Sequence, residues 1–566
     1  MNRPSISAFV GELRAQLTEP GSAFEVIEET VRGHSMPVFR HRARNARELL
    51  DGVHRFERRP YLVDGDLILS FDDLRSMVDG YAVHLQGELG VSSGDRVAIH
   101  AANRWEWVIA YWAAITIGAI PALFNGYWTA DETAHAAQLI DPVTIVADKP
   151  RLEIIGRTGI GVPTAAMDDL DSTVRRLAGR QPMLPPLDED QVAELVFTSG
   201  TTGRARAVAV PHRSLVGFVQ LNLFNDALAR VASGGSVPTV GELPPVDEDV
   251  VLVTSPLFHV SMLHGVVLQA IATGSSFVLL PGKFDPDRVL AAIERERVTR
   301  WLALGSAGPR VAESPSAVHY DTSSLRLLGV GGAPVSPATQ QALRDAFPSA
   351  KDAIGMGYTS TEAGAVVAGI GGPEYLLHPT ATGRPTVTTT IELRDPSGRR
   401  VADGEPGEVH VRSPYLMLGY WNDSPATAAA LPHDGWLAMG DIARFEADLL
   451  HIDSRARDMI LVSAENVSPT EVEYRLEAHS AVQEAAVLAV DHPLTGDAVG
   501  ACIVTAPQHP ASFEELAAWC AAELAPYKVP TRWIKLERPL PRTASGKVLK
   551  HEIRNLFVDD SGTEPT

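Results

Sequence analysis

The residues with the clearest chemical potential form a run of small side chains that directly follows a buried, strand-like segment. The run consists of Thr198, Ser199, Gly200, Thr201, Thr202 and Gly203. No side chain in it is larger than threonine, so it suits a loop whose N–H groups and hydroxyls surround an anion such as a polyphosphate. The order differs from that of a P-loop, because the basic residue, Arg206, comes after the run. A plain solvated loop has a similar composition, so the run alone leaves both interpretations open.

Five later motifs carry groups that suit a nucleotide. In the first, Gly332, Ala333 and Pro334 follow a strand-like run, and small residues there let a flat ring approach the backbone. The second, residues 358–362, combines an aromatic ring, hydroxyls and a carboxylate, which can stack a base, bind a phosphate oxygen and hold Mg²⁺. The remaining motifs contain Asp441, Arg455 and Lys547.

Composition bounds the class of protein. A chain of 566 residues is too long for one core, which predicts at least two domains. The net charge of −21 argues against nucleic acid or an anionic membrane surface as the main partner. Only two cysteines occur, Cys502 and Cys520, and they form neither a disulfide framework nor a metal-ligand spacing.

The N-terminus lacks an apolar stretch of signal-peptide length. The longest apolar segment, 107–124, contains Gly118 and Pro121, so it predicts a buried helix followed by a core strand and no integral membrane segment. A cytoplasmic enzyme is therefore the expectation.

Apolar runs and helical patterns alternate from Tyr61 onward, after an N-terminal cap of about sixty residues. Strands are predicted at 96–100, 143–147, 250–253, 276–280 and 325–330, and a helix at 105–117. The alternation indicates an α/β fold with a mostly parallel sheet. After about Pro373, short strands at 388–393 and 407–412 indicate a small β-barrel. After Asp458 a compact α/β pattern returns, with a helix at 469–477, a strand at 482–490 and a helix near 513–524.

The motifs, in this order, resemble those of the acyl-adenylating superfamily, which includes acyl-CoA synthetases, luciferases and peptide-synthetase adenylation domains. The resemblance extends from about Tyr61 to Arg554 and is greatest to bacterial fatty acyl-CoA ligases, through the runs 256–260 and 465–473. It implies a large N-terminal domain, residues 1–456, of two α/β subdomains and a β-barrel. A small mobile C-terminal domain, residues 457–566, would follow and would turn at a hinge near Arg457.

The resemblance also implies the chemistry. A carboxylate attacks the α-phosphorus of ATP to give acyl-AMP and pyrophosphate, and a thiol, usually that of coenzyme A, then displaces AMP. Positioning and charge stabilisation dominate such a reaction.

The site roles follow residue by residue. Residues 198–203, with Arg206 closing the loop, would hold the β- and γ-phosphates. Gly332, Ala333 and Pro334 would line the adenine site, with Tyr358 against the ring. Thr361 would contact the α-phosphate, Glu362 would bind Mg²⁺, and Asp441 and Arg455 would hold the ribose. Lys547 would bridge the charge that develops on carboxylate and α-phosphate. His259 would sit beside the acyl carboxylate, although a lone histidine after an apolar run is also typical of a structural residue.

Four positions depart from the family pattern. Arg206 replaces the usual lysine, and Thr359, Ser454 and Ala464 replace glycines. These changes leave the adenylation residues in place. Thr359 is expected to limit the bulk of the acyl group, and the Ala464 methyl to narrow the passage for the thiol.

Alternatives remain open at this level. In one alternative the acyl group passes to a carrier protein or an amine instead of CoA. In another the chain is a catalytically silent ATP- or acyl-binding protein. Fatty acids and steroid side-chain acids are the first substrates expected, with aryl acids after them. A homodimer is one compatible assembly.

Overall fold

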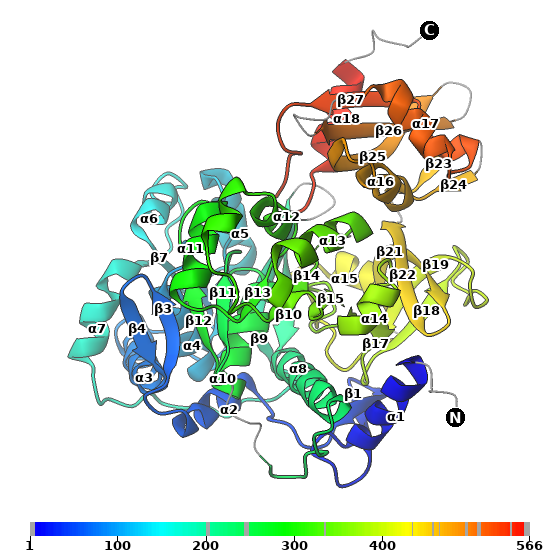
Figure 1. Ribbon diagram of the computed structural model, residues 1–566. Helices are drawn as coiled ribbons and strands as arrows, with labels where there is room; N and C mark the ends of the chain where they lie inside the picture. The colour runs from blue at the N-terminus through cyan, green and yellow to red at the C-terminus, as the bar shows by residue number, and fades with distance from the viewer. Residues whose placement is uncertain are drawn as a thin grey trace.

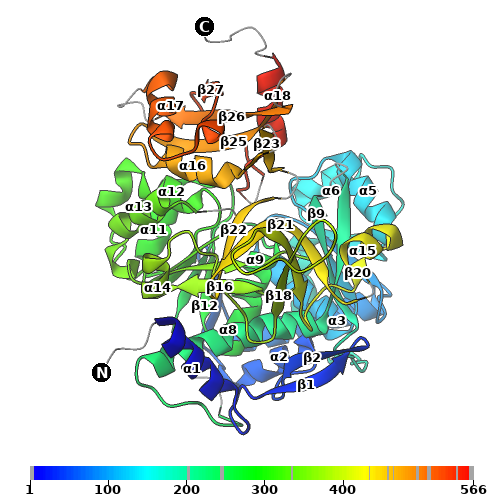
Figure 2. The same cartoon turned by 90° about the vertical axis from the view of Figure 1, so that its right-hand side faces the viewer.

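A larger body and a smaller lobe make up the molecule. The computed structural model describes residues 6–199, 204–242, 248–332, 335–432, 434–455, 458–462, 465–492, 496–505, 511–543 and 546–559. Figures 1 and 2 show the lobe, drawn in orange to red, on one end of the larger body. Across the described ranges, no helix is long and apolar enough to span a membrane.

A seven-stranded sheet carries the first α/β unit. Its order is β20-β10-β9-β6-β5-β7-β8. The strands are β5 (Arg96–His100), β6 (Ile120–Leu123), β7 (Thr144–Ala147), β8 (Thr164–Ala166), β9 (Val192–Ser199), β10 (Ala205–Pro211) and β20 (Gly419–Tyr420). From β9 through β6, β5 and β7 to β8 all pairings are parallel, and β10 and β20 extend the sheet antiparallel.

A nine-stranded sheet forms the second α/β unit, in the order β17-β16-β15-β14-β13-β11-β12-β3-β4. Its strands are β3 (Pro60–Asp64), β4 (Leu67–Ser70), β11 (Val250–Val253), β12 (Ser276–Leu279), β13 (Arg300–Leu302), β14 (Leu327–Val330), β15 (Ile354–Tyr358), β16 (Ala368–Gly371) and β17 (Arg384–Pro385). The central pairings, from β3 to β15, are parallel. The predicted α/β class with a mostly parallel sheet is confirmed.

Helices accompany both sheets, as Figure 1 shows. They are α3 (Phe71–Gly87), α4 (Trp105–Thr116), α5 (Ala130–Ile140), α6 (Lys149–Ile155), α7 (Leu170–Arg176), α8 (His212–Ala232), α9 (Val260–Met262), α10 (Gln269–Thr273), α11 (Pro286–Arg295), α12 (Ala307–Ala312), α13 (Pro337–Ala346), α14 (Gly372–Leu377) and α15 (Ser424–Ala430).

Helix α4 explains the long apolar segment of the sequence. All its residues from Glu106 to Thr116 are buried. Tyr111 donates to Glu194 of β9 in one sheet (2.8 Å), and the Trp112 indole donates to Tyr61 of β3 in the other (3.3 Å). Since both sheets cover the helix, it is apolar on all sides. The predicted buried helix followed by a short strand is confirmed.

The region predicted as a small β-barrel contains a four-stranded antiparallel sheet in the order β18-β19-β21-β22. The strands are β18 (Thr390–Arg394), β19 (Gly407–Arg412), β21 (Leu437–Glu446) and β22 (Leu449–Arg455). A bridge from Gly383 to Leu450 joins its outer strand to the segment just before β17. This sheet therefore lies against the nine-stranded sheet.

The lobe has its own core. Its elements are β23 (Ile460–Val462), β24 (Glu465–Val467), α16 (Pro469–Glu477), β25 (Val482–His492), β26 (Gly496–Thr505), α17 (Phe513–Ala521), β27 (Arg532–Leu536) and α18 (Lys550–Asp559). The bounds of α16 match the prediction because Ser468 caps the helix and Pro469 occupies its first turn. Both cysteines are buried and free. The boundary at 456/457 and the hinge residue Arg457 lie outside the described residues and stay predictions.

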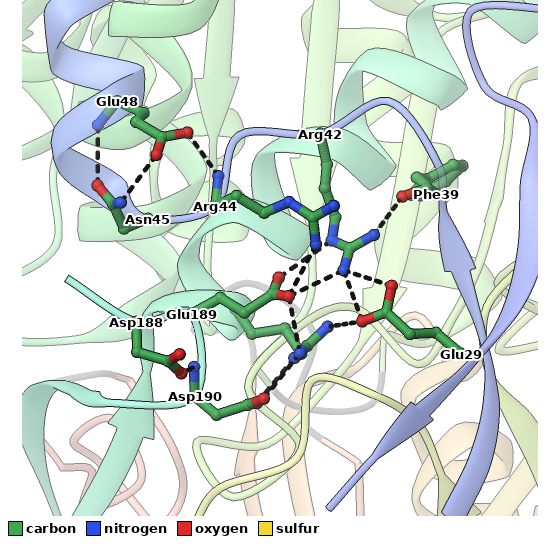
Figure 3. Close-up of polar contacts among 10 residues, drawn as sticks. Glu29, Phe39, Arg42, Arg44, Asn45, Glu48, Asp188, Glu189 and Asp190 are labelled. Atoms are coloured by element: carbon green, nitrogen blue, oxygen red, sulfur yellow. Dashed lines mark hydrogen bonds and ion pairs between the residues drawn. The ribbon is translucent and has the colours of Figure 1, made fainter. Parts of the chain in front are cut away.

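The N-terminal cap, α1 (Ile6–Thr18), β1 (Val26–Val31), β2 (His34–Phe39) and α2 (Ala46–Asp51), is tied to the body by ion pairs. Arg42, whose side chain is 3% exposed, donates to Glu29 and to Glu189, and Arg44 also donates to Glu189 (Figure 3). Arg213, at the start of α8, pairs with Asp190 in the same cluster (2.7 Å). The cluster anchors the cap beside the segment that leads into β9.

Candidate functional site

The predicted phosphate loop joins two antiparallel strands. Strand β9 ends at Ser199 and β10 begins at Ala205, and their register places Thr198 opposite Arg206. Ser199 and Ala205, which flank the loop in sequence, are therefore paired with each other. Residues Gly200, Thr201, Thr202 and Gly203 lie outside the described residues, so their contacts stay a prediction.

Arg206 meets two partners that the sequence did not indicate. Its Nε lies 3.4 Å from Asp423 Oδ2, and its guanidinium lies over the ring of Tyr420, 5.3 Å from the centroid. Tyr420 in turn donates its hydroxyl to Glu362 Oε1 (3.0 Å). Sequence reasoning missed Tyr420, since one aromatic residue in a short strand is also typical of plain packing. It links the basic residue of the phosphate loop to the predicted metal ligand.

Glu362 is suited to Mg²⁺ by its setting. Its backbone carbonyl accepts from Met417 N (2.9 Å), and its partly exposed carboxylate has one oxygen engaged by Tyr420. The described part of the chain contains no group of three or more acidic, histidine or cysteine side chains that could enclose a metal. Mg²⁺ commonly takes one or two carboxylates and completes its shell with waters and substrate phosphates, so a lone carboxylate fits.

The predicted ribose residues come together with the predicted adenine residue. Asp441 of β21 and Arg455 of β22 are opposite each other, and Arg455 Nε lies 2.8 Å from Asp441 Oδ1. Tyr358 donates its hydroxyl to Asp441 Oδ2 (2.5 Å). Burial raises the pKa of Asp441, and the charge of Arg455 offsets part of that rise. The ion pair therefore favours the ionised form of the carboxylate. Burial and the nearby Asp441 hold the pKa of Tyr358 well above its usual range.

Two glycines with positive φ precede the rest of the predicted adenine site. Gly331 and Gly332 follow β14 with φ of +149° and +76°, values that favour glycine. Gly331 accepts a hydrogen bond from Gly305 N (3.0 Å) at the end of the neighbouring strand. Ala333 and Pro334 lie outside the described residues and stay predictions.

The turn that carries Lys547 docks on the large body. Gly546 has φ of +85°, and a Cβ at Gly305 would lie 2.9 Å from its carbonyl oxygen, so the two backbones touch. The turn is closed by Thr543 N donating to Lys547 O (2.8 Å). Because Gly305 is hydrogen-bonded to Gly331, the turn docks next to the segment that precedes the predicted adenine residues, and sequence reasoning had not singled out Gly305.

The charge of Lys547 acts on two predicted partners. It lowers the pKa of His259, and it offsets part of the rise that burial causes in the pKa of Asp441. Burial is the larger cause for His259 and, with Lys547, lowers the pKa of its imidazole to about 4. His259 is therefore neutral at pH 7 and can take part as a hydrogen-bonding group beside a carboxylate.

The two threonines of the 358–362 motif make different hydrogen bonds. Thr359 Oγ1 donates to Ala365 O (2.6 Å), so its hydroxyl closes the loop that carries Glu362. Thr361 is partly exposed at its position before Glu362, and its carbonyl accepts from Gly364 N (3.2 Å). The expected effects of Thr359 on acyl bulk and of Thr361 on the α-phosphate stay predictions. Ala464 lies outside the described residues.

Comparisons with known proteins bear on the family of this chain. A family model described as AMP-binding enzyme matches residues 50–421, and one described as AMP-binding enzyme C-terminal domain matches residues 471–547. The chain is 32% identical over 498 residues to a feruloyl-CoA synthase from an Amycolatopsis species, covering 87% of this chain and 95% of the relative. It is 31% identical over 552 residues to a long-chain-fatty-acid–CoA ligase of Yersinia pestis, covering 90% and 94%. A solved amide bond synthetase from Marinactinospora thermotolerans matches with a TM-score of 0.77 at 29% identity, covering 90% of this chain and 100% of that chain.

Proposed function

The chain belongs to the AMP-binding enzyme family, and from that premise we propose that it activates a hydrophobic carboxylic acid with ATP and transfers the acyl group to coenzyme A. Its relatives are CoA ligases and synthetases, so the enzyme class is an AMP-forming acid–thiol ligase. The observation that supports the proposal is the backbone contact between Gly546 and Gly305, which holds the turn carrying Lys547 against the large body. In the proposed mechanism, Lys547 would serve a nucleotide site and an acyl site together.

In the first half-reaction an oxygen of the acid attacks the α-phosphorus of ATP, and the bond from that phosphorus to pyrophosphate breaks. Asp441 and Arg455 would hold the ribose, and Lys547 would stabilise charge on the carboxylate and α-phosphate oxygens. Bound at Glu362, Mg²⁺ would supply positive charge to the phosphates. Neutral His259 would orient the acyl carboxylate.

In the second half-reaction the CoA sulfur attacks the acyl carbon, and the bond from that carbon to AMP breaks. The small lobe would rotate about the segment near Arg457 and carry Lys547 away. Two arrangements of one lobe would then serve two reactions in turn.

The acid substrate can be identified by assaying the protein with a panel of carboxylic acids. The sequence alone favoured fatty and steroid side-chain acids, but the relatives are named for feruloyl and coumarate substrates as well as for long-chain fatty acids. We therefore place aryl acids beside fatty acids as first candidates. Pyrophosphate release with aryl acids, fatty acids of stepped length and steroid side-chain acids would rank them. Failure of every acid to stimulate exchange of labelled pyrophosphate into ATP would overturn the proposal in favour of a silent binding protein.

The acceptor needs its own assay, because a structural neighbour is an amide bond synthetase. Preformed acyl-AMP supplied with CoA, a holo carrier protein or an amine would give a thioester, a loaded carrier or an amide. We expect the CoA thioester to form fastest. Faster amide formation would make the amine ligase the correct alternative.

Ala464→Gly tests whether the extra methyl hinders the thiol. We expect the variant to speed thioester formation from preformed acyl-AMP and to leave adenylation unchanged, because only the second substrate would pass this residue. The two half-reactions, followed separately, measure the effect. Equal rates in wild type and variant would show that the methyl is neutral and would remove it as a reason for poor CoA use.

The contact between lobe and body predicts a pH dependence. Helix α16 packs on α13, and Glu477 at this contact is hydrogen-bonded to Ser336. Burial, with the nearby Glu473 and Glu484, raises the pKa of Glu477 to about 7. If rotation exposes Glu477, its pKa returns to about 4.3, so closing takes up a proton between these values. Raising the pH through that window should weaken closure, and above about pH 7 the dependence should end.

Glu477→Gln should abolish this dependence, because its amide does not titrate. Energy transfer between dyes on α14 and α18, followed from pH 5 to 8, measures closure in both proteins. Glu514→Gln, at an exposed carboxylate of α17, is the matched control and should behave as wild type. An unchanged pH response in Glu477→Gln would show that another group controls closure.

A further inference from the structure

We propose that Arg206 and Tyr420 form a positioning pair for the Glu362 carboxylate, in which the flat guanidinium of Arg206 holds the Tyr420 ring and the Tyr420 hydroxyl holds Glu362. The inference rests on the proposed role of Glu362 as the metal ligand and adds residues that act through it. It also assigns a use to Arg206, the residue at which the phosphate loop departs from the family pattern.

The hydrogen bond from Tyr420 engages only one oxygen of the Glu362 carboxylate. The Tyr420 hydroxyl donates to Glu362 Oε1 at 3.0 Å, which leaves the other carboxylate oxygen for a cation. An ionised carboxylate can only accept, so in this pair the Tyr420 hydroxyl is the donor. A donor that fixes a metal-binding carboxylate in this way typically changes metal affinity by about 10–100-fold.

Sheet geometry brings Arg206 to Tyr420. Strand β20 pairs antiparallel with β10, with Tyr420 opposite Val208. Arg206 is two residues from Val208, so its side chain lies on the same face and diagonal to Tyr420, a distance that long side chains bridge. The observed guanidinium, 5.3 Å from the ring centroid, agrees with this placement.

Asp423 fixes the other end of Arg206. One Asp423 oxygen, Oδ1, accepts from Ala426 N (3.0 Å) at the start of α15, and the other, Oδ2, lies 3.4 Å from Arg206 Nε. The hydrogen bond from Ala426 thus fixes the orientation of the carboxylate that pairs with Arg206. A guanidinium can stack its flat face on the Tyr420 ring and at the same time pair with Asp423 through an N–H group at its edge. The compact ammonium of lysine has no flat face to stack.

The two possible uses of Arg206 predict different measurements. A side chain that only neutralises phosphate charge would affect nucleotide affinity whether or not a metal is present. A side chain that positions Glu362 would affect only the additional affinity that the metal confers. The informative quantity is therefore the ratio of ATP affinity with Mn²⁺ to ATP affinity in EDTA, measured by calorimetry without any acid, so that no turnover occurs.

We expect Tyr420→Phe, which keeps the ring, to lower this ratio by about tenfold. Arg206→Lys and Arg206→Met should each lower it several-fold and by similar factors, because both lose the flat guanidinium. If Arg206→Met does not fold, as judged by thermal unfolding, Arg206→Lys and Tyr420→Phe decide the question. A wild-type ratio in Tyr420→Phe, or in the charge-keeping Arg206→Lys, would overturn the inference.

Glu362→Gln separates failure of this inference from failure of the proposed function. If Glu362→Gln keeps the wild-type ratio, Glu362 is not the metal ligand and the proposed site is wrong. If Glu362→Gln lowers the ratio while Tyr420→Phe does not, the ligand is correct and only the positioning pair fails.

Discussion

Lys547→Ala should slow acyl-AMP formation by about two to three orders of magnitude and still convert supplied acyl-AMP and CoA to acyl-CoA. During adenylation the Lys547 ammonium would meet charge that accumulates on the α-phosphate and carboxylate oxygens, an interaction strongest in the transition state. During thioester formation the lobe would have carried Lys547 away. Quenched-flow measurement of each half-reaction gives the two rates.

Lys535→Ala provides the matched control, because Lys535 is an exposed lysine of the same lobe, on β27. It should leave both half-reactions near wild type. Equal slowing of both half-reactions in Lys547→Ala would mean that the two arrangements of the lobe do not apply to this chain.

Glu362→Gln should depress adenylation by orders of magnitude with little change in folding. The amide has nearly the same shape as the carboxylate, but it lacks the charge that a hard cation prefers. The residue lies in a partly exposed loop, so its loss removes little packing. Pyrophosphate release at saturating Mg²⁺ measures the effect, and thermal unfolding checks the fold.

Glu405→Gln makes the same chemical change at an exposed position of the large body and should be without effect. Near-normal pyrophosphate release in Glu362→Gln would remove Glu362 from the metal site. Partial recovery of the variant at high Mg²⁺ would be consistent with weakened binding of the cation.

Several helices, strands and candidate site residues of this protein could be predicted from short stretches of its sequence. The strands Arg96–His100 and Val250–Val253 have the predicted bounds, because the apolar run that each contains is buried by any arrangement that covers the sheet. Helix α16 also has its predicted bounds, since its cap and first-turn proline are adjacent in sequence. The predicted nucleotide residues Tyr358, Asp441 and Arg455 could be identified as a set because each lies in a short motif of distinctive composition.

Tertiary structure decided how those motifs act on one another. Tyr420 meets Glu362 only because β20 adds to β10, and the two residues are 58 positions apart in the chain. The turn that carries Lys547 lies against the large body because Gly546 and Gly305 pack backbone to backbone. Such contacts join segments with no shared periodicity, and they depend on which strand edges and lobe surfaces meet. Sequence therefore determined which groups were present, and the packing of sheets and lobe determined their partners, because hydrogen bonds and charge effects act over distances in space that sequence separation does not encode.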